Sequence, residues 1–308
     1  MTVCKISILI PINSKNFLVD TLRSVQSQSI DHGLMEIVLI LDRINLSLIN
    51  EIVEEEIRDI PVIILESDSP GIVRALNLGL EKANGEFIAR LDQDDVMLPN
   101  RLKLQYEFLE KHSDFAAVGG QIVLMNESGL ILNSISYPTS PQKCKKIMFY
   151  QSPIPHPAVM FRKEEVLSLG GYREQIPEDW DLWVRFVENS KILNLNSPVI
   201  NYRIHDGQLS RTSMYQMTRS RKSIITSRRL RHKGLYDLPP ISLSPEKWYE
   251  VTTKGLTFGF MVIFWDQLRW RTWDLAQLFK RSIKKLRNYI LKNIDKQNKT
   301  IQLMHDHY

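Results

Sequence analysis

Short runs of Ile, Val and Leu recur about every 25 residues in the first 92 positions, and this repetition restricts the fold more than any other feature of the chain. The runs occupy 5–12, 36–42, 62–67 and 86–92. Amphipathic segments with helical spacing lie between them, at 16–29, 46–58 and 71–83. Strands that are apolar along their whole length and alternate with helices form parallel sheets covered on both faces. The sequence therefore predicts an α/β fold with a central, mostly parallel sheet flanked by helices.

The fourth apolar run leads into ARLDQDD at 89–95, which places three acids within four positions. If the strand continues that far, Asp92 and Asp94 project from one face while Asp95 points elsewhere. Two neighbouring anions repel unless a cation lies between them, and a hard divalent ion with oxygen ligands is the usual partner. The pattern thus favours a metal–diphosphate site over a plain acidic loop.

A calcium loop of the EF-hand type is the other reading of these acids. It fails because the twelfth position counted from Asp92 is Lys103 and the required glycine is missing. A further helix is expected to begin at Pro99 and to run to about 112. The acids then lie in a strand-to-helix loop at the carboxyl edge of the sheet, where ligands of open α/β sheets bind.

Two other residues are expected near the same edge. Asp42 follows the second predicted strand, and an acid there either caps a helix or contacts a ligand. Arg74 lies near the start of the third helix, where its guanidinium either meets a base or phosphate or stays on the surface.

The next part of the chain is less regular. It contains predicted strands at 116–126 and 156–162 and a predicted helix at 178–188 that opens with Glu178 and Asp179. Acids are favoured at a helix N-terminus by the exposed amides and the dipole, which alone can explain both. After His205 the composition becomes basic and aromatic, so we expect a domain boundary near 207.

The sequence predicts a cytoplasmic protein. Its two cysteines, Cys4 and Cys144, have no nearby Cys or His partner pattern, which argues against disulfides and structural zinc. The N-terminal apolar run is too short for a signal peptide, and the apolar stretch 256–265 is about half the length that crosses a bilayer.

Basic residues are concentrated in the last third of the chain, although the formal net charge is only +5. Residues 210–233 contain eight Lys and Arg and no acid, and 265–299 contain ten against three Asp. Such a surface suits a polyanion, but no nucleic-acid-binding signature accompanies it. Helices with an apolar and a cationic side favour an anionic membrane surface, the alternative being helices packed on the catalytic domain with a solvated basic face.

Several segments in this order resemble the family 2 glycosyltransferases with the GT-A fold. They are IPIN (10–13), EIVLILD (36–42), GIVRALNLGL (71–80), EFIARLDQDD (86–95), PNRL (99–102), HPAVMFRK (156–163), GGYRE (170–174), EDWDLWVR (178–185) and YRIHDGQLS (202–210). Within that family the chain is similar to bacterial enzymes that extend lipooligosaccharide or O-antigen chains. The resemblance covers about 1–210.

The resemblance implies a domain organisation. A GT-A catalytic domain is expected over 1–206, with a nucleotide-sugar-binding half at 1–114 and an acceptor-binding half at 115–206. A basic helical region, suited to a membrane surface, is expected over 207–308.

It also implies roles for the residues of the donor site. Pro11 and Asp42 match positions that line the nucleotide base and ribose, and Arg74 matches an arginine that faces the base or diphosphate. Asp92 and Asp94 match the DXD pair that holds a divalent ion, and the last acid of that loop is Asp95. Leu41 departs from the pattern, since many members have an acid there, which makes the base and ribose contacts less certain than the metal site.

On the acceptor side, Asp179 matches the catalytic base, with Glu178 beside it contacting the acceptor. His205 lies in a segment that closes over the diphosphate in the family. A histidine at a strand end is often structural, but a neutral imidazole there can also complete the coordination of the metal or bond a phosphate oxygen.

The implied activity is that of an inverting glycosyltransferase that depends on Mn2+ or Mg2+. It would move a hexose or N-acetylhexosamine from a UDP-sugar to a hydroxyl of a lipid-linked or lipopolysaccharide-type saccharide, forming a β-linkage at the inner face of the cytoplasmic membrane. The alternatives are a polyprenyl-phosphate sugar synthase, which needs no base for a sugar hydroxyl, and a non-catalytic basic membrane- or nucleic-acid-binding protein on the same scaffold.

Overall fold

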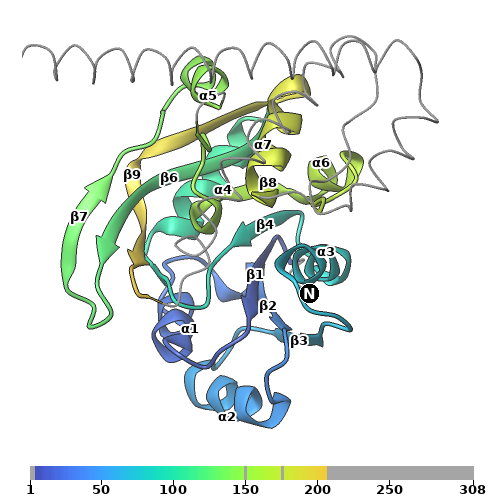
Figure 1. Ribbon diagram of the computed structural model, residues 1–308, viewed down its shortest axis with the longest axis vertical. Helices are drawn as coiled ribbons and strands as arrows, with labels where there is room; N and C mark the ends of the chain where they lie inside the picture. Colours follow the sequence, from blue (N-terminus) through green and yellow to red (C-terminus); the bar gives the residue numbers. More distant parts are fainter. Residues whose placement is uncertain (1–3, 149–150, 175–176, 207–308) are drawn as a thin grey trace, which may run out of the picture. The chain divides into compact units, whose positions relative to one another are not determined.

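Figure 1 shows the computed structural model of the chain, which describes residues 4–148, 151–174 and 177–206. The predicted boundary near 207 and the predicted basic helical region 207–308 lie outside the described residues. None of the described helices combines the length and the apolar character needed to cross a membrane.

The described strands are β1 (Ile6–Ile12), β2 (Met35–Leu41), β3 (Val62–Glu66), β4 (Phe87–Arg90), β5 (Val96–Met97), β6 (Phe115–Met125), β7 (Ile131–Ile135), β8 (Met160–Arg162) and β9 (Lys191–Arg203). The described α-helices are α1 (Leu18–Gln26), α2 (Leu46–Glu56), α3 (Ile72–Lys82), α4 (Arg101–Lys111), α5 (Pro141–Ile147), α6 (Lys163–Ser168) and α7 (Glu178–Asn189). Two 3-10 helices are η1 (His32–Leu34) and η2 (His156–Ala158).

In the described part of the chain the strands form one sheet in the order β3-β2-β1-β4-β8-β6-β9-β5, with β7 paired to β6. β1 is parallel to β2 and to β4, and β2 is parallel to β3, which confirms the parallel arrangement expected for the first half. β8 is antiparallel to both β4 and β6, whereas β6 and β9 are parallel. The sheet as a whole is therefore mixed, and each of its antiparallel pairs includes at least one strand of the second half.

Two segments of the second half differ from the expectation. Only the last part of the predicted strand 156–162 is a strand, because His156–Ala158 forms the turn η2 around Pro157, which has no backbone N–H for a ladder. The 13-residue strand β9 was not among the predicted strands. Its sequence, KILNLNSPVINYR, mixes polar residues and a proline with the apolar ones, so its strand signal is weak.

The apolar strands supply two cores, one on each face of the sheet. Along β1, Ile6, Ile8, Ile10 and Ile12 belong to one buried cluster, and Leu9 belongs to the other. Successive side chains of a strand point to opposite faces, so a strand buried on both faces needs an uninterrupted apolar run. This requirement explains the runs that recur in the sequence.

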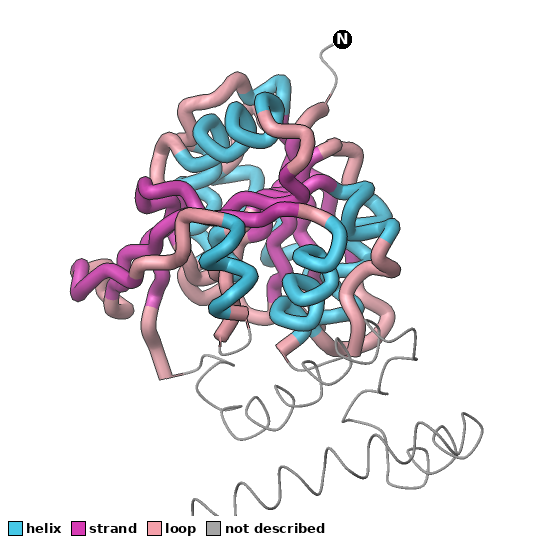
Figure 2. Tube along the Cα trace, turned by 90° about the horizontal axis from the view of Figure 1, so that it is seen from above, coloured by secondary structure: helices cyan, strands magenta, loops and turns pink. Residues whose placement is uncertain are grey.

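Helices cover both faces, as Figure 2 shows from a second direction. Leu22 of α1, Ile49 of α2 and Leu102 of α4 belong to the first cluster. Leu76 of α3 and Trp183 of α7 belong to the second. The loops that leave the carboxyl ends of β1, β2 and β4 lead to helices on these two faces, which brings the predicted donor residues to one edge of the sheet.

Gly85 is required by a close approach between two segments. A Cβ atom there would lie 2.5 Å from the backbone nitrogen of Ser7 and 2.8 Å from its Oγ. The backbone N–H of Gly85 donates to that Oγ at 2.8 Å, and the hydroxyl in turn donates to the buried Glu36 at 2.5 Å. The helix predicted over 71–83 is confirmed, since α3 spans Ile72–Lys82.

We expect Gly85→Ala to destabilise the protein by about 1–3 kcal/mol, because the added methyl group meets backbone that cannot move away cheaply. Gly79→Ala in α3 is the matched comparison, since its Cβ would meet the Cδ1 of Ile40 at 2.9 Å, a flexible side-chain end, and a helical alanine gains propensity. Urea unfolding of both variants measures the difference. An equal or larger loss for Gly79→Ala would contradict this explanation.

Candidate functional site

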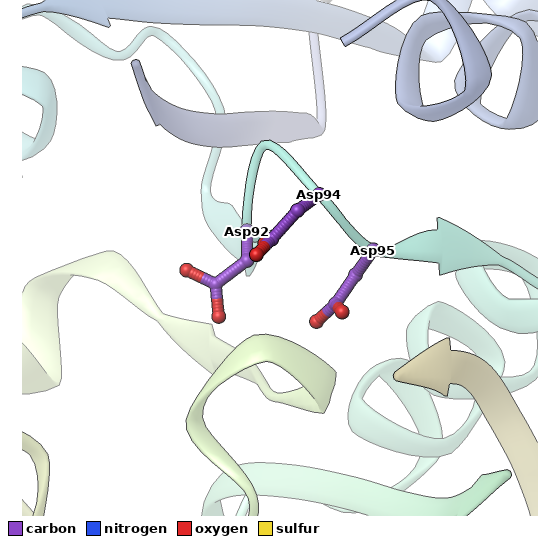
Figure 3. Close-up of side chains that lie close together, drawn as sticks. All are labelled: Asp92, Asp94 and Asp95. Carbon is purple, nitrogen blue, oxygen red and sulfur yellow. The ribbon is translucent and has the colours of Figure 1, made fainter. Parts of the chain in front are cut away.

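The acids of the ARLDQDD segment lie in a loop that begins directly after β4 ends at Arg90. The strand does not reach Asp92, so the predicted alternation of Asp92 and Asp94 on a strand does not occur. The expectation that Asp95 points elsewhere is also wrong, because the loop turns and brings one oxygen of each carboxylate within 4.8 Å of the others (Figure 3). Asp92 and Asp94 are half-buried, and Asp95 is fully buried.

Bonds to the start of the chain hold the backbone of this loop. The Thr21 hydroxyl of α1 lies 2.7 Å from the carbonyl oxygen of Gln93 and 2.8 Å from that of Asp95. The Gln93 side chain accepts hydrogen bonds from the backbone N–H groups of Asn13, at 2.8 Å, and Ser14, at 3.2 Å. The acid loop is thereby joined to the loop that follows β1.

A buried arginine partly offsets the negative charge of the three acids. Arg90 is 4% exposed, and its guanidinium forms an ion pair with the carboxylate of Asp92. Although burial opposes its charge, the carboxylate of Asp92 raises the pKa of Arg90 above its usual range. An arginine that remains charged in this position reduces the repulsion among the acids.

The acids themselves resist ionisation. Burial raises the pKa of Asp95 well above its ordinary value, and the charges of Asp92 and Asp94 raise it further. Burial also raises the pKa of Asp92, against the opposing effect of Arg90. A cation bound here would reverse these shifts, because it would stabilise the ionised carboxylates.

The end of β9 brings His205 to the acid loop, as the sequence resemblance implied. The Nε2 atom of His205 lies 2.6 Å from Oδ2 of Asp94, and its ring packs against Phe17 at 5.4 Å. Next to this contact, the backbone N–H of Arg203 donates to Oδ1 of Asp95 at 2.9 Å.

The donor set fits a divalent cation. Carboxylate oxygens and an imidazole nitrogen are ligands that Mn2+ accepts, and Mg2+ prefers the oxygens. Among the described residues, the buried Oδ2 atom of Asp95 has no hydrogen-bond partner, as expected for an acceptor that needs a cation or a water molecule. Asp92, Asp94 and His205 offer the remaining ligand atoms.

The residues predicted for the nucleotide lie at the ends of β1 and β2. Pro11 in β1 is in register with Ile40 in β2, and Asp42 follows β2 directly. The Oδ2 atom of Asp42 accepts the backbone N–H of Gly71 at 3.1 Å, immediately before α3 begins. Asp42 therefore contacts the segment that leads into α3, but it does not cap a described helix, since Asn45 caps α2 and Gly71 precedes α3 without a side-chain cap.

Arg74 lies on the surface of α3. Its Nη1 atom donates to the hydroxyl of Ser69 at 2.5 Å, and its Nε atom lies 3.6 Å from the exposed Glu174 carboxylate. Among the described residues, the structure thus places it beside the 69–71 loop, without a hydrogen bond or ion pair to the acids of 92–95.

The first turn of α7 carries the two predicted acceptor-side acids. Ser152 Oγ lies 3.4 Å from Oδ2 of Asp179. The Oε1 atom of Glu178 is 3.7 Å from Nδ1 of His156, and Nε2 of His156 is 2.9 Å from the Tyr172 hydroxyl. Both acids therefore lie close to the segment from Ser152 to His156, which leads into η2.

Their titration is perturbed in a way that suits proton transfer. Burial and the neighbouring Asp179 charge raise the pKa of Glu178 to about 7, and the charge of Asp92 contributes in the same direction. Burial also raises the pKa of Asp179, while bonds from the Trp180 backbone N–H and Ser152 oppose the rise. Groups that titrate near neutrality beside a second acid are characteristic of catalytic sites.

His156 does not form an ion pair with Glu178. Burial and the nearby Arg90 lower the pKa of His156 well below its usual value, so the imidazole is neutral at pH 7. The same Arg90 charge lowers the pKa values of Glu178 and Asp179. One arginine thus acts electrostatically on both groups of acids.

Sequence reasoning missed Arg90, His156 and Arg203, although all three lie in segments that it singled out. The available signal was an arginine inside an otherwise apolar, buried strand, two positions before the first acid, since charged side chains are seldom fully buried without a partner. His156 was noted only as the start of a strand.

Comparisons with known proteins place the relatives of this chain among glycosyltransferases. The family described as Glycosyl transferase family 2 matches residues 7–169. The O-antigen biosynthesis glycosyltransferase WbnJ of Escherichia coli is 36% identical over 144 residues, which are 46% of this chain and 56% of that protein. The E. coli UDP-Gal:alpha-D-GlcNAc-diphosphoundecaprenol beta-1,3-galactosyltransferase is 28% identical over 60% of this chain and 68% of its own length.

A solved structure shows the same fold. S. aureus TarS 1–349 in complex with UDP-GlcNAc superposes with a TM-score of 0.54 at 17% identity, over 79% of this chain and 78% of that one. The chain spans about half of the length of several curated relatives that it matches. The family match includes the acid loop, whereas Asp179 and His205 lie beyond its end.

The raised pKa of Glu178 makes stability depend on pH. Between the usual value of 4.5 and about 7 the folded state keeps a proton that the unfolded state loses, so the stability of the wild type falls as pH rises through this window. Glu178→Gln cannot ionise at this position. We therefore expect its free energy of unfolding, relative to that of wild type, to be on the order of 3 kcal/mol larger at pH 8 than at pH 4.5.

Thermal unfolding followed by circular dichroism at both pH values measures this difference. The exposed Glu107→Gln is the control and should shift the melting temperature equally at both. A Glu178→Gln effect that does not change with pH would show that this carboxyl titrates normally.

Proposed function

The chain belongs to glycosyl transferase family 2, and from this premise we propose that it moves a hexose or N-acetylhexosamine from a UDP-sugar to a hydroxyl group of a lipid-linked or lipopolysaccharide-type saccharide. The observation that carries the proposal is the convergence of Asp92, Asp94 and Asp95 with His205 at the carboxyl edge of the sheet. A nucleotide diphosphate is bound at this position in open α/β folds.

On the donor side, the chain supplies three carboxylates whose negative charge is partly offset by Arg90. Asp92, Asp94 and His205 would hold Mn2+ or Mg2+, which supplies Lewis-acid stabilisation of the departing diphosphate when bound. Arg90 keeps Asp92 in place from within the protein. Pro11 and Asp42 stand where the nucleoside would lie, and Arg74 is proposed to face the base or diphosphate.

On the acceptor side, Asp179 is proposed as the general base. It takes the proton of the acceptor hydroxyl as the hydroxyl oxygen bonds to the anomeric carbon, while the bond to the diphosphate oxygen breaks on the opposite face. One such displacement inverts the anomeric centre, so an α-linked UDP-sugar gives a β-linked product. Glu178 is proposed to contact the acceptor.

Two considerations favour Asp179 over Glu178 as the base. Burial raises the pKa of Asp179, but hydrogen bonds from the Trp180 backbone N–H and the Ser152 hydroxyl favour its charged form and oppose this rise. Burial and the charge of Asp179 raise the pKa of Glu178 to about 7, and its protonated carboxyl can donate a hydrogen bond to an acceptor hydroxyl.

The acceptor class follows from the relatives' names. WbnJ is named for O-antigen biosynthesis, and the galactosyltransferase is named for a diphosphoundecaprenol-linked acceptor. An acceptor carried on a lipid would place the enzyme at the inner face of the cytoplasmic membrane, and the basic residues of 207–308 would favour that surface.

The proposal predicts metal-dependent release of UDP. The full-length protein, incubated with Mn2+ and a panel of UDP-hexoses and UDP-N-acetylhexosamines, should release UDP from at least one donor, and EDTA should abolish the release. Asp94→Asn should lower the rate at least about 100-fold, because a metal ligand is lost, while the exposed Asp114→Asn should not. Release that EDTA leaves unchanged would contradict the metal site, and no release from any donor would contradict UDP-sugar use.

The base assignment predicts a separation of binding from turnover. Asp179→Asn should reduce transfer by about 100- to 10,000-fold, because proton removal is lost, while UDP binding measured by calorimetry stays within twofold of wild type. Glu178→Gln, the neighbouring control, should retain more turnover and mainly raise KM for the acceptor. NMR of the product should show a β-linkage. Full turnover by Asp179→Asn, or an α-linked product, would exclude this mechanism.

A further inference from the structure

Four segments of the chain meet at the side chain of Arg203, which is 2% exposed at the end of β9. Its Nε atom donates to the carbonyl oxygen of Asp94 at 2.9 Å, and its Nη1 atom donates to that of Glu127 at 2.8 Å. Its Nη2 atom donates to the carboxylate of Asp20 in α1 at 2.9 Å. Its backbone N–H bonds Asp95, so one residue holds both the backbone and a side chain of the acid loop.

The same guanidinium lies over the ring of Phe17, with its carbon 4.4 Å from the ring centroid. Phe17 has a φ of 64°, a left-handed conformation that is unfavourable for a bulky residue and persists only when its surroundings fix it. The Phe17 ring also packs against His205. Arg203 therefore supports the ring that positions the imidazole next to Asp94.

These contacts require the shape of arginine. A planar guanidinium donates in several fixed directions, here to two carbonyl oxygens and a carboxylate, while its face stacks on an aromatic ring. A lysine ammonium at the same place can reach some of these acceptors but cannot stack or hold them in one plane. The arrangement of the acid loop is thus coupled to one side chain from the far end of the described chain.

We propose that Arg203 is a positioning residue that holds the acid loop and the imidazole of His205 in the arrangement that binds the divalent cation. The inference rests on the metal site of the proposed function and adds a residue that touches neither the cation nor the substrate. It acts through the Asp94 carbonyl, the Asp95 carboxylate and the Phe17 ring.

Arg162 offers a matched control within the same sheet. Its guanidinium also donates to backbone carbonyl oxygens, of Phe115 at 3.1 Å and of Leu109 at 2.6 Å, and lies over the ring of Phe87 at 5.1 Å. It makes these contacts around β8, without any to the acid loop. Removal of either guanidinium loses packing and hydrogen bonds, but only the removal of the Arg203 guanidinium is expected to weaken the affinity for the cation.

The test is Mn2+ binding by the full-length protein, measured as loss of the free-ion EPR signal, with wild type, Arg203→Met, Arg203→Lys and Arg162→Met. We expect Arg203→Met to raise the Kd for Mn2+ by about 10- to 100-fold, the range found when partners of metal ligands are removed. Arg203→Lys should recover part of the affinity, and Arg162→Met should stay within twofold of wild type. Melting temperatures report the general loss of stability in each variant.

An unchanged Kd in Arg203→Met, or an equal rise in Arg162→Met, would overturn the inference while leaving the metal site intact. If Arg203→Met does not fold, Asp20→Asn decides, because Asp20 is half exposed and supports Arg203 without touching the acids. A higher Kd for Mn2+ in Asp20→Asn supports the inference, and an unchanged Kd refutes it. Absence of Mn2+ binding by wild type would instead be a failure of the proposed metal site.

Discussion

The structure depends on the placement of three carboxylates within 4.8 Å of one another at the edge of the sheet. Such an arrangement is unfavourable by itself, because burial and mutual repulsion both oppose ionisation. The protein offsets this cost with Arg90 from inside the sheet and with hydrogen bonds from α1 and β9. One arginine does not neutralise three carboxylates, so the loop keeps an excess of negative charge that a divalent cation would offset.

The charge of Arg90 also links the acid loop to the first turn of α7. Arg90 pairs with Asp92 and opposes the rise that burial causes in the pKa values of Glu178 and Asp179, and it adds to the effect of burial that keeps His156 neutral. Without that charge, the half-buried Glu178 and Asp179 of α7 would lose a contribution that favours their ionised forms. One arginine therefore stabilises the ionised acids of α7 as well as Asp92 of the acid loop.

The first half of the fold could be predicted from the sequence because strands buried on both faces are apolar along most of their length, as β1 and β2 are apart from Ser7 and Glu36. The candidate site residues Asp92, Asp94 and His205 could be proposed from their motifs, and the structure brings these three side chains together. The orientation of Asp95 could not, because it depends on where β4 stops. The role of Arg203 could not either, since its contacts need β9 to pair with β6, and no local pattern encodes that pairing.

The long separation between the acid loop and β9 also has a consequence for how the protein is made. Asp95 and Arg203 are 108 positions apart, so the backbone N–H that completes the loop leaves the ribosome long after the loop itself. Contacts of such high sequence separation form late in folding. The parallel strands of the first half can pair during synthesis, but the acid loop acquires its final partners only once β9 has been added to the sheet.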